Sequence, residues 1–253
     1  MILGLEFPPI SHAIEWPALF LEGTPFEVNK VVVLMWVSVA LVFAFYIVAS
    51  RKQQLVPTGV QNIAESAVEF IQEGVIRQTI GSDGMRYTPF LLAIFSFVFV
   101  CNIWGIIPGA QMPVNARIAL PALMAIVVWV IFNVVGIKHQ GPIGYFKNMM
   151  FPPGVPKALY ILVSPIELVS TLFVRPLSLS VRLFANMLAG HLLLISFAVL
   201  STALWESTYI GAIFPAALLV GLTGFEILVA FLQAYIFTIL TAVYIGGALH
   251  PDH

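Results

Sequence analysis

Long apolar runs constrain the fold of this sequence more than any other feature. Lys30 is followed by about 20 residues without a charge, which is enough for a helix to cross the hydrocarbon core of a bilayer. The chain is 60% hydrophobic and 9% charged, whereas soluble domains carry about 25% charged residues. We therefore expect an all-α integral membrane protein with five membrane-embedded helical segments, at about residues 31–50, 88–107, 118–137, 158–204 and 208–249.

The last two segments are much longer than a perpendicular span needs. We expect them either to be long, tilted and antiparallel or to fold into hairpins. Pro165 and Pro176 are the expected bend points in the first of the two, because an internal proline breaks the helical hydrogen bonding. Trp205, Glu206 and Ser207 form the expected break between them, and a loop rich in proline and glycine follows residue 137.

Residues 57–80 have a different pattern. Apolar residues fall on one side of a helix and polar ones on the other, which predicts an amphipathic helix that starts at Pro57 and lies along the membrane surface or against partner chains. The apolar side consists of Ile63, Ala67, Phe70, Ile71 and Val75, and the polar side of Gln61, Glu65, Glu69, Gln72 and Glu73.

Two domains are expected, an extracytoplasmic segment at residues 1–29 and a membrane domain at residues 30–253. The first 29 residues contain four prolines and lack the basic start and long apolar core of a cleavable signal peptide. The positive-inside rule places the N-terminus outside and the C-terminus in the cytoplasm. Only two cations then lie outside, Lys30 and Arg117, whereas seven lie inside, namely Arg51, Lys52, Arg77, Arg86, Lys138, Lys147 and Lys157.

Arg182 stands in the middle of one of the long apolar segments. A charge there costs roughly 2.5 to 3.5 kcal/mol on insertion scales, so an ionisable residue inside the membrane is a functional hypothesis. Helical spacing puts a polar seam on one face, made of Thr171, Arg175, Ser178, Arg182 and Asn186. The structural alternative is an arginine that extends to the lipid headgroups, and for Arg175 it is as plausible as a functional role.

A second polar seam lies on the last apolar segment, where Thr223, Glu226, Gln233, Thr241 and Tyr244 recur near one face. Glu226 is an acid inside an apolar run, and His191 on the preceding segment is a candidate partner across an antiparallel pair. Gln233 is expected to reach the depth of Arg182. The structural alternatives are a neutral, hydrogen-bonded Glu226 and a packed core histidine. A fixed cation beside an acid and an imidazole suits proton movement.

Several function classes find no support. A net charge of −1 indicates no nucleic-acid partner, and the single cysteine, Cys101, excludes an internal disulfide and cysteine-rich metal clusters. The sequence contains no GxxxxGK[ST] motif, so we expect no nucleotide site. It contains neither an HExxH motif nor a Gly-flanked serine motif, which argues against an intramembrane protease. We expect no metal site and no cofactor. A secondary ion-coupled membrane transporter is the alternative function, although such proteins contain internal repeats that are not evident here.

The segment RPLSLSVRLFANMLAGHLL at residues 175–193 resembles subunit a of the F-type ATP synthase, the stator half of its proton channel. LQAYIFTILTAVYI near the C-terminus and the pattern of spans extend the resemblance over most of the chain, except the first 30 residues. Where some relatives have an aspartate shortly after an asparagine in the second span, this chain has Asn102-Ile103-Trp104-Gly105.

The resemblance implies a non-catalytic, proton-translocating subunit of a rotary ATP synthase. Arg182 matches the essential arginine that acts on the rotor carboxylate and separates the two half-channels. Asn186 and Gln233 match polar positions beside it, and His191 and Glu226 match two positions on the path from outside, with acid and imidazole exchanged relative to some relatives. The implied partners are the rotor-ring c subunits, the peripheral-stalk b subunit and the lipid of a bacterial plasma membrane.

Overall fold

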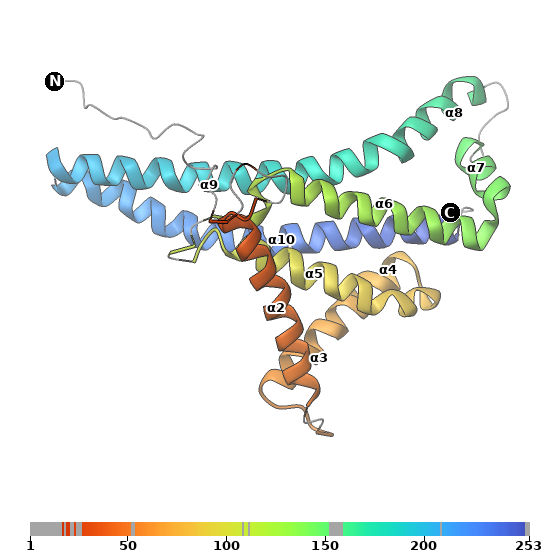
Figure 1. The fold of residues 1–253 in the computed structure, drawn as a ribbon, viewed down its shortest axis with the longest axis horizontal. Helices are drawn as coiled ribbons and strands as arrows, with labels where there is room; N and C mark the ends of the chain where they lie inside the picture. The colour runs from red at the N-terminus through yellow and green to blue at the C-terminus, as the bar shows by residue number, and fades with distance from the viewer. Residues whose placement is uncertain are drawn as a thin grey trace. The chain divides into compact units, whose positions relative to one another are not determined.

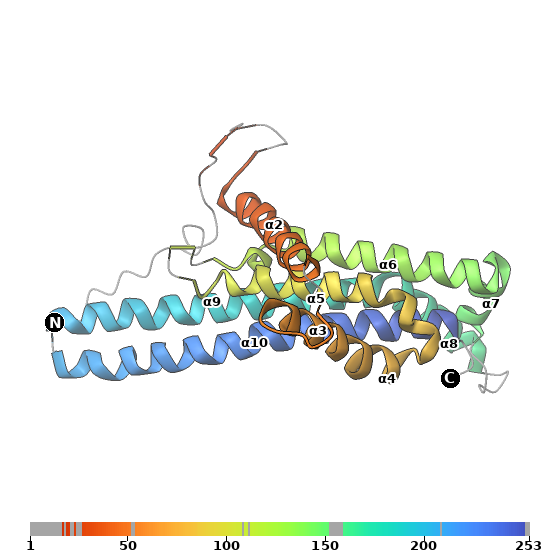
Figure 2. The same ribbon diagram turned by 90° about the horizontal axis from the view of Figure 1, so that it is seen from below.

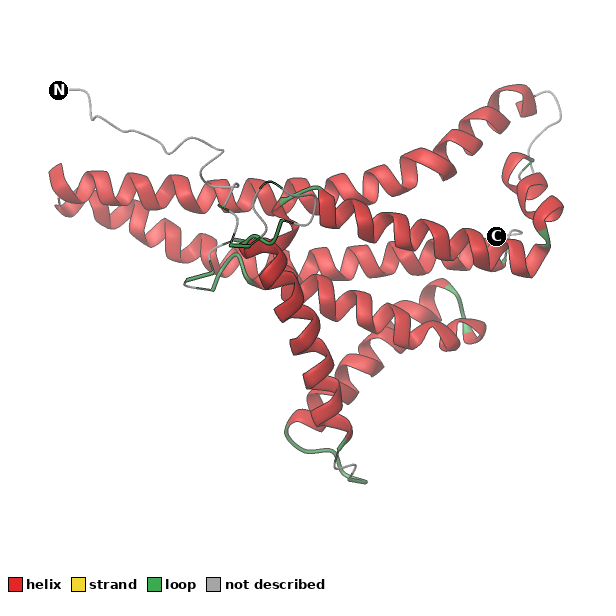
Figure 3. Ribbon diagram, viewed as in Figure 1, coloured by secondary structure: helices red, strands yellow, loops and turns green. Residues whose placement is uncertain are grey.

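The computed structural model is built from helices, and it divides into two compact units (Figure 3). Unit 1 comprises Met1–Val42, Phe97–Arg117 and Leu183–Gln233, and unit 2 comprises Phe43–Ser96, Ile118–Arg182 and Ala234–His253. The structure describes residues 17, 19–20, 23, 27–51, 54–107, 109–110, 112–151, 159–207 and 209–250, without the side chains of 206 and 207. Most of the predicted N-terminal segment, Lys52, Lys157 and the last three residues lie outside this part of the chain.

Among the described residues, five helices are long and apolar enough to cross a membrane, which confirms the predicted fold class. They cover Lys30–Ser50, Ser82–Ile103, Ala119–Gln140, Tyr160–Trp205 and Tyr209–Leu249. Within the described residues, β pairing is limited to an isolated bridge between Phe20 and Val28. The chain is thus a multi-pass α-helical membrane protein.

Unit 1 contains the C-terminal part of the first of the two longest helices and the N-terminal part of the second. Helix α9 (Arg175–Ser207) and helix α10 (Tyr209–Leu249) lie side by side and antiparallel over their parts in this unit (Figures 1 and 2). Position 208, which joins them, lies outside the described residues, and α10 is one helix of 41 residues. The hairpin alternative for the two long segments is therefore wrong.

Helix α2 (Lys30–Ser50) begins in unit 1, where the Asn29 side chain accepts a hydrogen bond from the Val32 amide at 3.2 Å and caps the helix. The indole of Trp104 donates to Ser38 of α2 at 2.7 Å, just after the end of helix α5 (Thr88–Ile103). The Trp104–Ser38 hydrogen bond attaches α2 to the segment that follows α5.

Unit 2 contains the predicted amphipathic helix. It consists of α3 (Val60–Ile71), a π-helix η1 (Gln72–Ile76) and α4 (Arg77–Thr79), and a 3-10 helix η2 (Ser82–Tyr87) follows it. It begins three residues after Pro57, because Gly59 adopts a positive φ of 59° that ends the preceding loop. On the predicted apolar side, Ile71 and Val75 are fully buried within the chain, whereas Ile63 is exposed.

Helix α6 (Ala119–Gln140) packs against the C-terminal part of α10 in unit 2. Gln140 donates a hydrogen bond to the Ala248 carbonyl at 2.7 Å, and the ring centres of Phe132 and Tyr244 lie 5.7 Å apart.

Three further helical segments are divided between the two units. Unit 1 contains a short 3-10 helix η3 (Val114–Ala116), and unit 2 contains helix α8 (Tyr160–Val169) and π-helix η5 (Ser170–Val174).

Residues after 137 were expected to form a loop, but α6 continues to Gln140 and helix α7 covers Pro142–Met150. Gly141 has a φ of 76°, which reverses the chain, and Pro142 then takes the first helical position, where its missing N–H is harmless. The Tyr145 ring packs on Gly136, where a Cβ would collide with it. Proline and glycine here delimit a helix rather than a loop.

Candidate functional site

Arg182, the central predicted residue, lies in unit 2 near the middle of the apolar run Tyr160–Trp205. Its side chain is exposed, as are those of Ser178 and Asn186, four residues before and after it on α9. These three residues form one polar seam, because residues four apart share a helix face. The ion pairs of the described residues include Arg175 but not Arg182.

Thr171 does not continue this exposed seam, contrary to the expectation from regular helical spacing. Its side chain is buried, and it lies in η5, where the helix is wound as a π-helix between the two prolines that were expected to bend it. Pro176 has no amide to offer the carbonyl four residues earlier, and a wider turn accommodates this loss. The irregularity lies between Pro165 and Pro176 rather than at either one.

Arg175 does not extend alone to the headgroups. Its Nη2 donates to Oε1 of Glu167 on α8 at 2.8 Å, and its guanidinium carbon lies 5.5 Å from the centre of the Tyr244 ring. Both charged side chains are about one-third exposed. The sequence reading missed Glu167, although a carboxylate inside an apolar run is the signal that identified Glu226.

Glu226 and His191 belong to unit 1, and the structure brings the acid to the position next to the histidine. A Cβ built on Gly190 would collide with Oε1 of Glu226 and lie 3.3 Å from its Cδ. The Glu226 carboxylate therefore packs on the backbone of α9 beside His191, whose side chain is buried. The missing side chain at Gly190 makes this close approach possible.

Gln233 is buried in unit 1, seven residues after Glu226. Its predicted closeness to Arg182 stays a prediction. Thr223 and Thr241 donate to carbonyls of their own helix, those of Leu219 and Phe237, each at 2.8 Å. These two threonines of the second seam thus satisfy their hydroxyl groups locally.

Two buried asparagines in unit 1 form a polar pair that the sequence reading did not assemble. Asn115 Nδ2 donates to Asn102 Oδ1 at 2.7 Å, and Asn102 Nδ2 donates to the Ala230 carbonyl at 3.4 Å. Both asparagines are at most 2% exposed. Ala230 lies one turn after Glu226, so this pair contacts α10 between Glu226 and Gln233. The sequence signal that could have found this pair is Asn102, a polar amide inside the second apolar segment.

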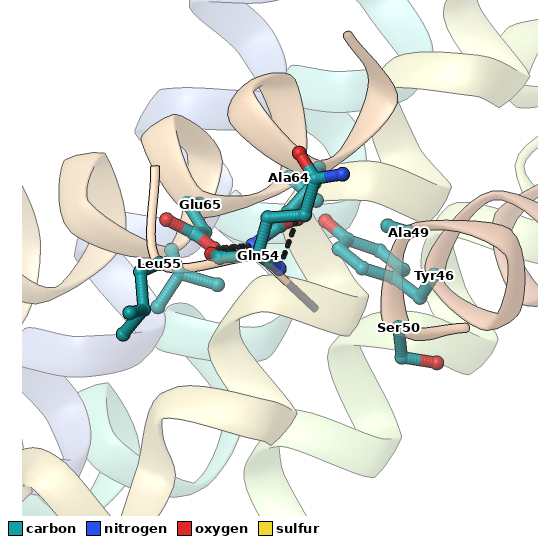
Figure 4. Close-up of a pocket in the computed structure, with 9 residues that line it drawn as sticks. Tyr46, Ala49, Ser50, Gln54, Leu55, Ala64 and Glu65 are labelled. Atoms are coloured by element: carbon teal, nitrogen blue, oxygen red, sulfur yellow. Dashed lines mark hydrogen bonds between the residues drawn. The ribbon is translucent and has the colours of Figure 1, made fainter. Parts of the chain in front are cut away.

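An open hollow of about 630 Å³ lies in unit 2, at the end of α2 and the start of α3 (Figure 4). In the wall of this hollow, the Gln61 side-chain amide donates hydrogen bonds to Oε1 of Glu65 at 2.6 Å and to the Gln54 carbonyl at 3.0 Å. It also accepts one from the Gln54 amide at 3.1 Å. None of the predicted site residues lines it. Among the described residues, no three histidine, cysteine or acidic side chains are grouped so that they could hold a metal ion.

Helices long enough for five spans, with an arginine and a glutamate inside them, define a multi-pass membrane protein with ionisable groups in its apolar segments. The sequence model of the family described as ATP synthase A chain matches residues 32–246. The chain is 44% identical to ATP synthase subunit a of Frankia alni, over 99% of this chain and 88% of the relative. It is 41% identical to that subunit of Rhodococcus erythropolis, over 93% of this chain and 88% of the relative. The chain belongs to the ATP synthase A chain family.

Proposed function

We propose that this chain is the proton-channel stator subunit of an F-type ATP synthase, and that protons cross the membrane through two half-channels between it and a rotor ring. The observation that carries the proposal is Arg182, an exposed arginine in an apolar helix of a family whose relatives are named ATP synthase subunit a. Family membership favours this function over the secondary transporter that the polar seams alone left open.

Arg182 acts on the carboxylate of each passing rotor subunit. Its positive charge favours the ionised carboxylate and keeps protons from passing directly between the half-channels. A rotor carboxylate that has been protonated can turn into lipid without the full cost of a buried charge. It then makes nearly a full turn before it releases its proton on the other side of Arg182.

Protons enter from outside past Glu226 and His191, which exchange them as acid and imidazole. The packing of the Glu226 carboxylate beside His191 supports this pairing. Asn186 and Gln233 provide polar groups on the way to Arg182. The buried pair of Asn102 and Asn115 supplies polar groups near α10 in a chain that lacks the aspartate some relatives have in the second span.

Ser178 and Arg175 lie on the other side of Arg182 along α9 and belong to the inner half of the path. The N-terminus is outside and the C-terminus in the cytoplasm of a bacterial plasma membrane. The partners are the rotor-ring c subunits and the peripheral-stalk b subunit. The chain itself performs no chemistry on nucleotide, and the coupling of ATP synthesis to proton flow depends on the complete complex.

The test is ATP-driven proton pumping by inverted vesicles that contain the complete complex with Arg182→Ala. We expect pumping to vanish while the complex still assembles, because no fixed cation then acts on the rotor carboxylate. Arg51→Ala is the matched control, since it removes an exposed arginine just after α2 and should pump like the wild type. Pumping by the Arg182→Ala complex at the wild-type rate would refute the proposed function.

A further inference from the structure

Glu167 and Arg175 are eight residues apart in the sequence, yet their side chains form an ion pair at 2.8 Å. In a regular α-helix, eight residues correspond to a rotation about 80° away from a common face. The π-helix η5 lies between them, and the Arg175 amide donates to the Ser170 carbonyl five residues earlier. One extra residue in this turn reduces the offset to that of seven α-helical residues, about 20°. The π-helix therefore puts carboxylate and guanidinium on one face.

Two tyrosines lie near the pair. Tyr244 of α10 stacks under the Arg175 guanidinium, and Tyr145 of α7 lies within electrostatic reach of it. Burial raises the pKa of Tyr145, and the Arg175 charge acts in the opposite direction. The carboxylate among these neighbours of Arg175 is that of Glu167, so Glu167 supplies the negative charge set against the guanidinium.

Arg175 and Arg182 are seven residues apart on α9, which corresponds to about 10 Å along the axis and nearly the same face. Two unpaired guanidinium groups at this separation would both act on one carboxylate that approaches α9. The pairing with Glu167 cancels the charge of Arg175, and no carboxylate of the described residues pairs with Arg182.

We propose that Glu167 is a charge-balancing residue: through the π-helix η5 it neutralises Arg175 and leaves Arg182 as the cation that the rotor carboxylate meets. This inference rests on the proposed function. Glu167 acts through Arg175 and is therefore a positioning residue. Without it, two cations would hold the rotor carboxylate in its ionised form, and protonation of that carboxylate would require a lower pH.

The experiment compares Glu167→Gln, Arg175→Gln, the double variant and Glu167→Asp in the complete complex. The readout is the pH at which ATP-driven pumping is half-maximal, normalised to the amount of assembled complex. At a separation of about 10 Å and an effective dielectric constant of about 20, one charge corresponds to a shift of about one pH unit. We expect E167Q to move the midpoint down, R175Q to move it up, and E167D and the double variant to keep it at the wild-type value.

Shifts of opposite sign distinguish charge balance from a structural ion pair, whose loss would lower assembly without moving the two midpoints apart. Equal midpoints in all four variants would overturn the proposal. If E167Q does not assemble, the midpoint of R175Q must still lie above that of the double variant, and equal values would overturn the proposal. The Arg182→Ala complex is measured in parallel. If it pumps at the wild-type rate, the proposed function itself is refuted. If it does not pump and the four other variants have equal midpoints, only the charge balance is refuted.

Discussion

Gly190 has no Cβ, and the Oε1 atom of Glu226 occupies the space in which one would lie. The position of this carboxylate thus depends on a residue that carries no chemistry of its own. Periodicity predicts that Glu226 and His191 meet across an antiparallel pair, but it cannot show that the acid rests against the backbone one residue away. That detail depends on how closely α9 and α10 approach each other within unit 1.

Replacing Gly190 by Ala should displace the Glu226 carboxylate and leave the helix intact, because the colliding atom is the end of a flexible side chain. We expect the pumping rate of the assembled complex to fall on the order of ten-fold, since displacing a functional group by about 1 Å can lower a rate by up to ~10²-fold. Proton pumping in inverted vesicles checks this.

Gly247→Ala is the matched control, because a methyl group there meets nothing within 4 Å and α10 is helical at this residue. It should pump at the wild-type rate. Wild-type pumping by the Gly190→Ala complex would show that proton transfer does not require the carboxylate to lie at this position.

At the scale of helices, irregular turns decide which residues meet. The regular spacing that groups Thr171 with Arg175 fails at η5, whereas it holds for Ser178 and Arg182 in the regular part of α9. A π-helix adds one residue to a turn and rotates all later positions about the helix axis, and regular helical spacing does not predict where this happens. The sequence therefore predicts the polar seam only where the helix is regular.

The close contact of α10 with α4 in unit 2 gives a prediction at this scale. A Cβ on Gly246 would lie 2.7 Å from the carbonyl oxygen of Thr79, and a backbone atom cannot turn aside as a side chain can. We expect Gly246→Ala to destabilise the subunit by about 1–3 kcal/mol. The measurement is the temperature at which half of the subunit is lost from the detergent-solubilised complex.

Gly247→Ala is again the comparison, because it changes the neighbouring residue on the same helix in the same way without a collision. Its midpoint temperature should equal that of the wild type or slightly exceed it, since alanine has the higher helix propensity. Equal stability of the Gly246 and Gly247 variants would contradict the tight contact between α10 and α4.

At the scale of the whole molecule, the distribution of lysine and arginine predicts the orientation in the membrane. We expect a cysteine at Glu27 to react with a membrane-impermeant maleimide on intact cells, and one at Leu55 to react only in inverted vesicles. Both positions are exposed and lie at opposite ends of α2. Cys101 is buried, and its replacement by serine removes background labelling.

The reverse labelling pattern would show that the N-terminus is cytoplasmic and that the positive-inside count fails for this chain. Labelling of both positions from one side would contradict a membrane-spanning α2. A background variant without any added cysteine should remain unlabelled on both sides.

The sequence by itself determined the class of protein, the number of spans and the residues that carry charge into the membrane. These properties depend on the length and local composition of each segment, because the free energy of transfer into lipid is summed along the chain. The segment at residues 175–193 also identified the family that the comparisons show.

Only the tertiary structure decided the partners of those charges. It paired Glu167 with Arg175 across a π-helix, set Glu226 against Gly190, joined Asn102 to Asn115 and turned an expected loop into α7. The contacts of Glu226 and Asn102 depend on how one helix is rotated and shifted against another, whereas the Glu167–Arg175 pair depends on the extra residue in η5. Side-chain packing sets this register over many residues at once, and the spacing within a single helix does not encode it.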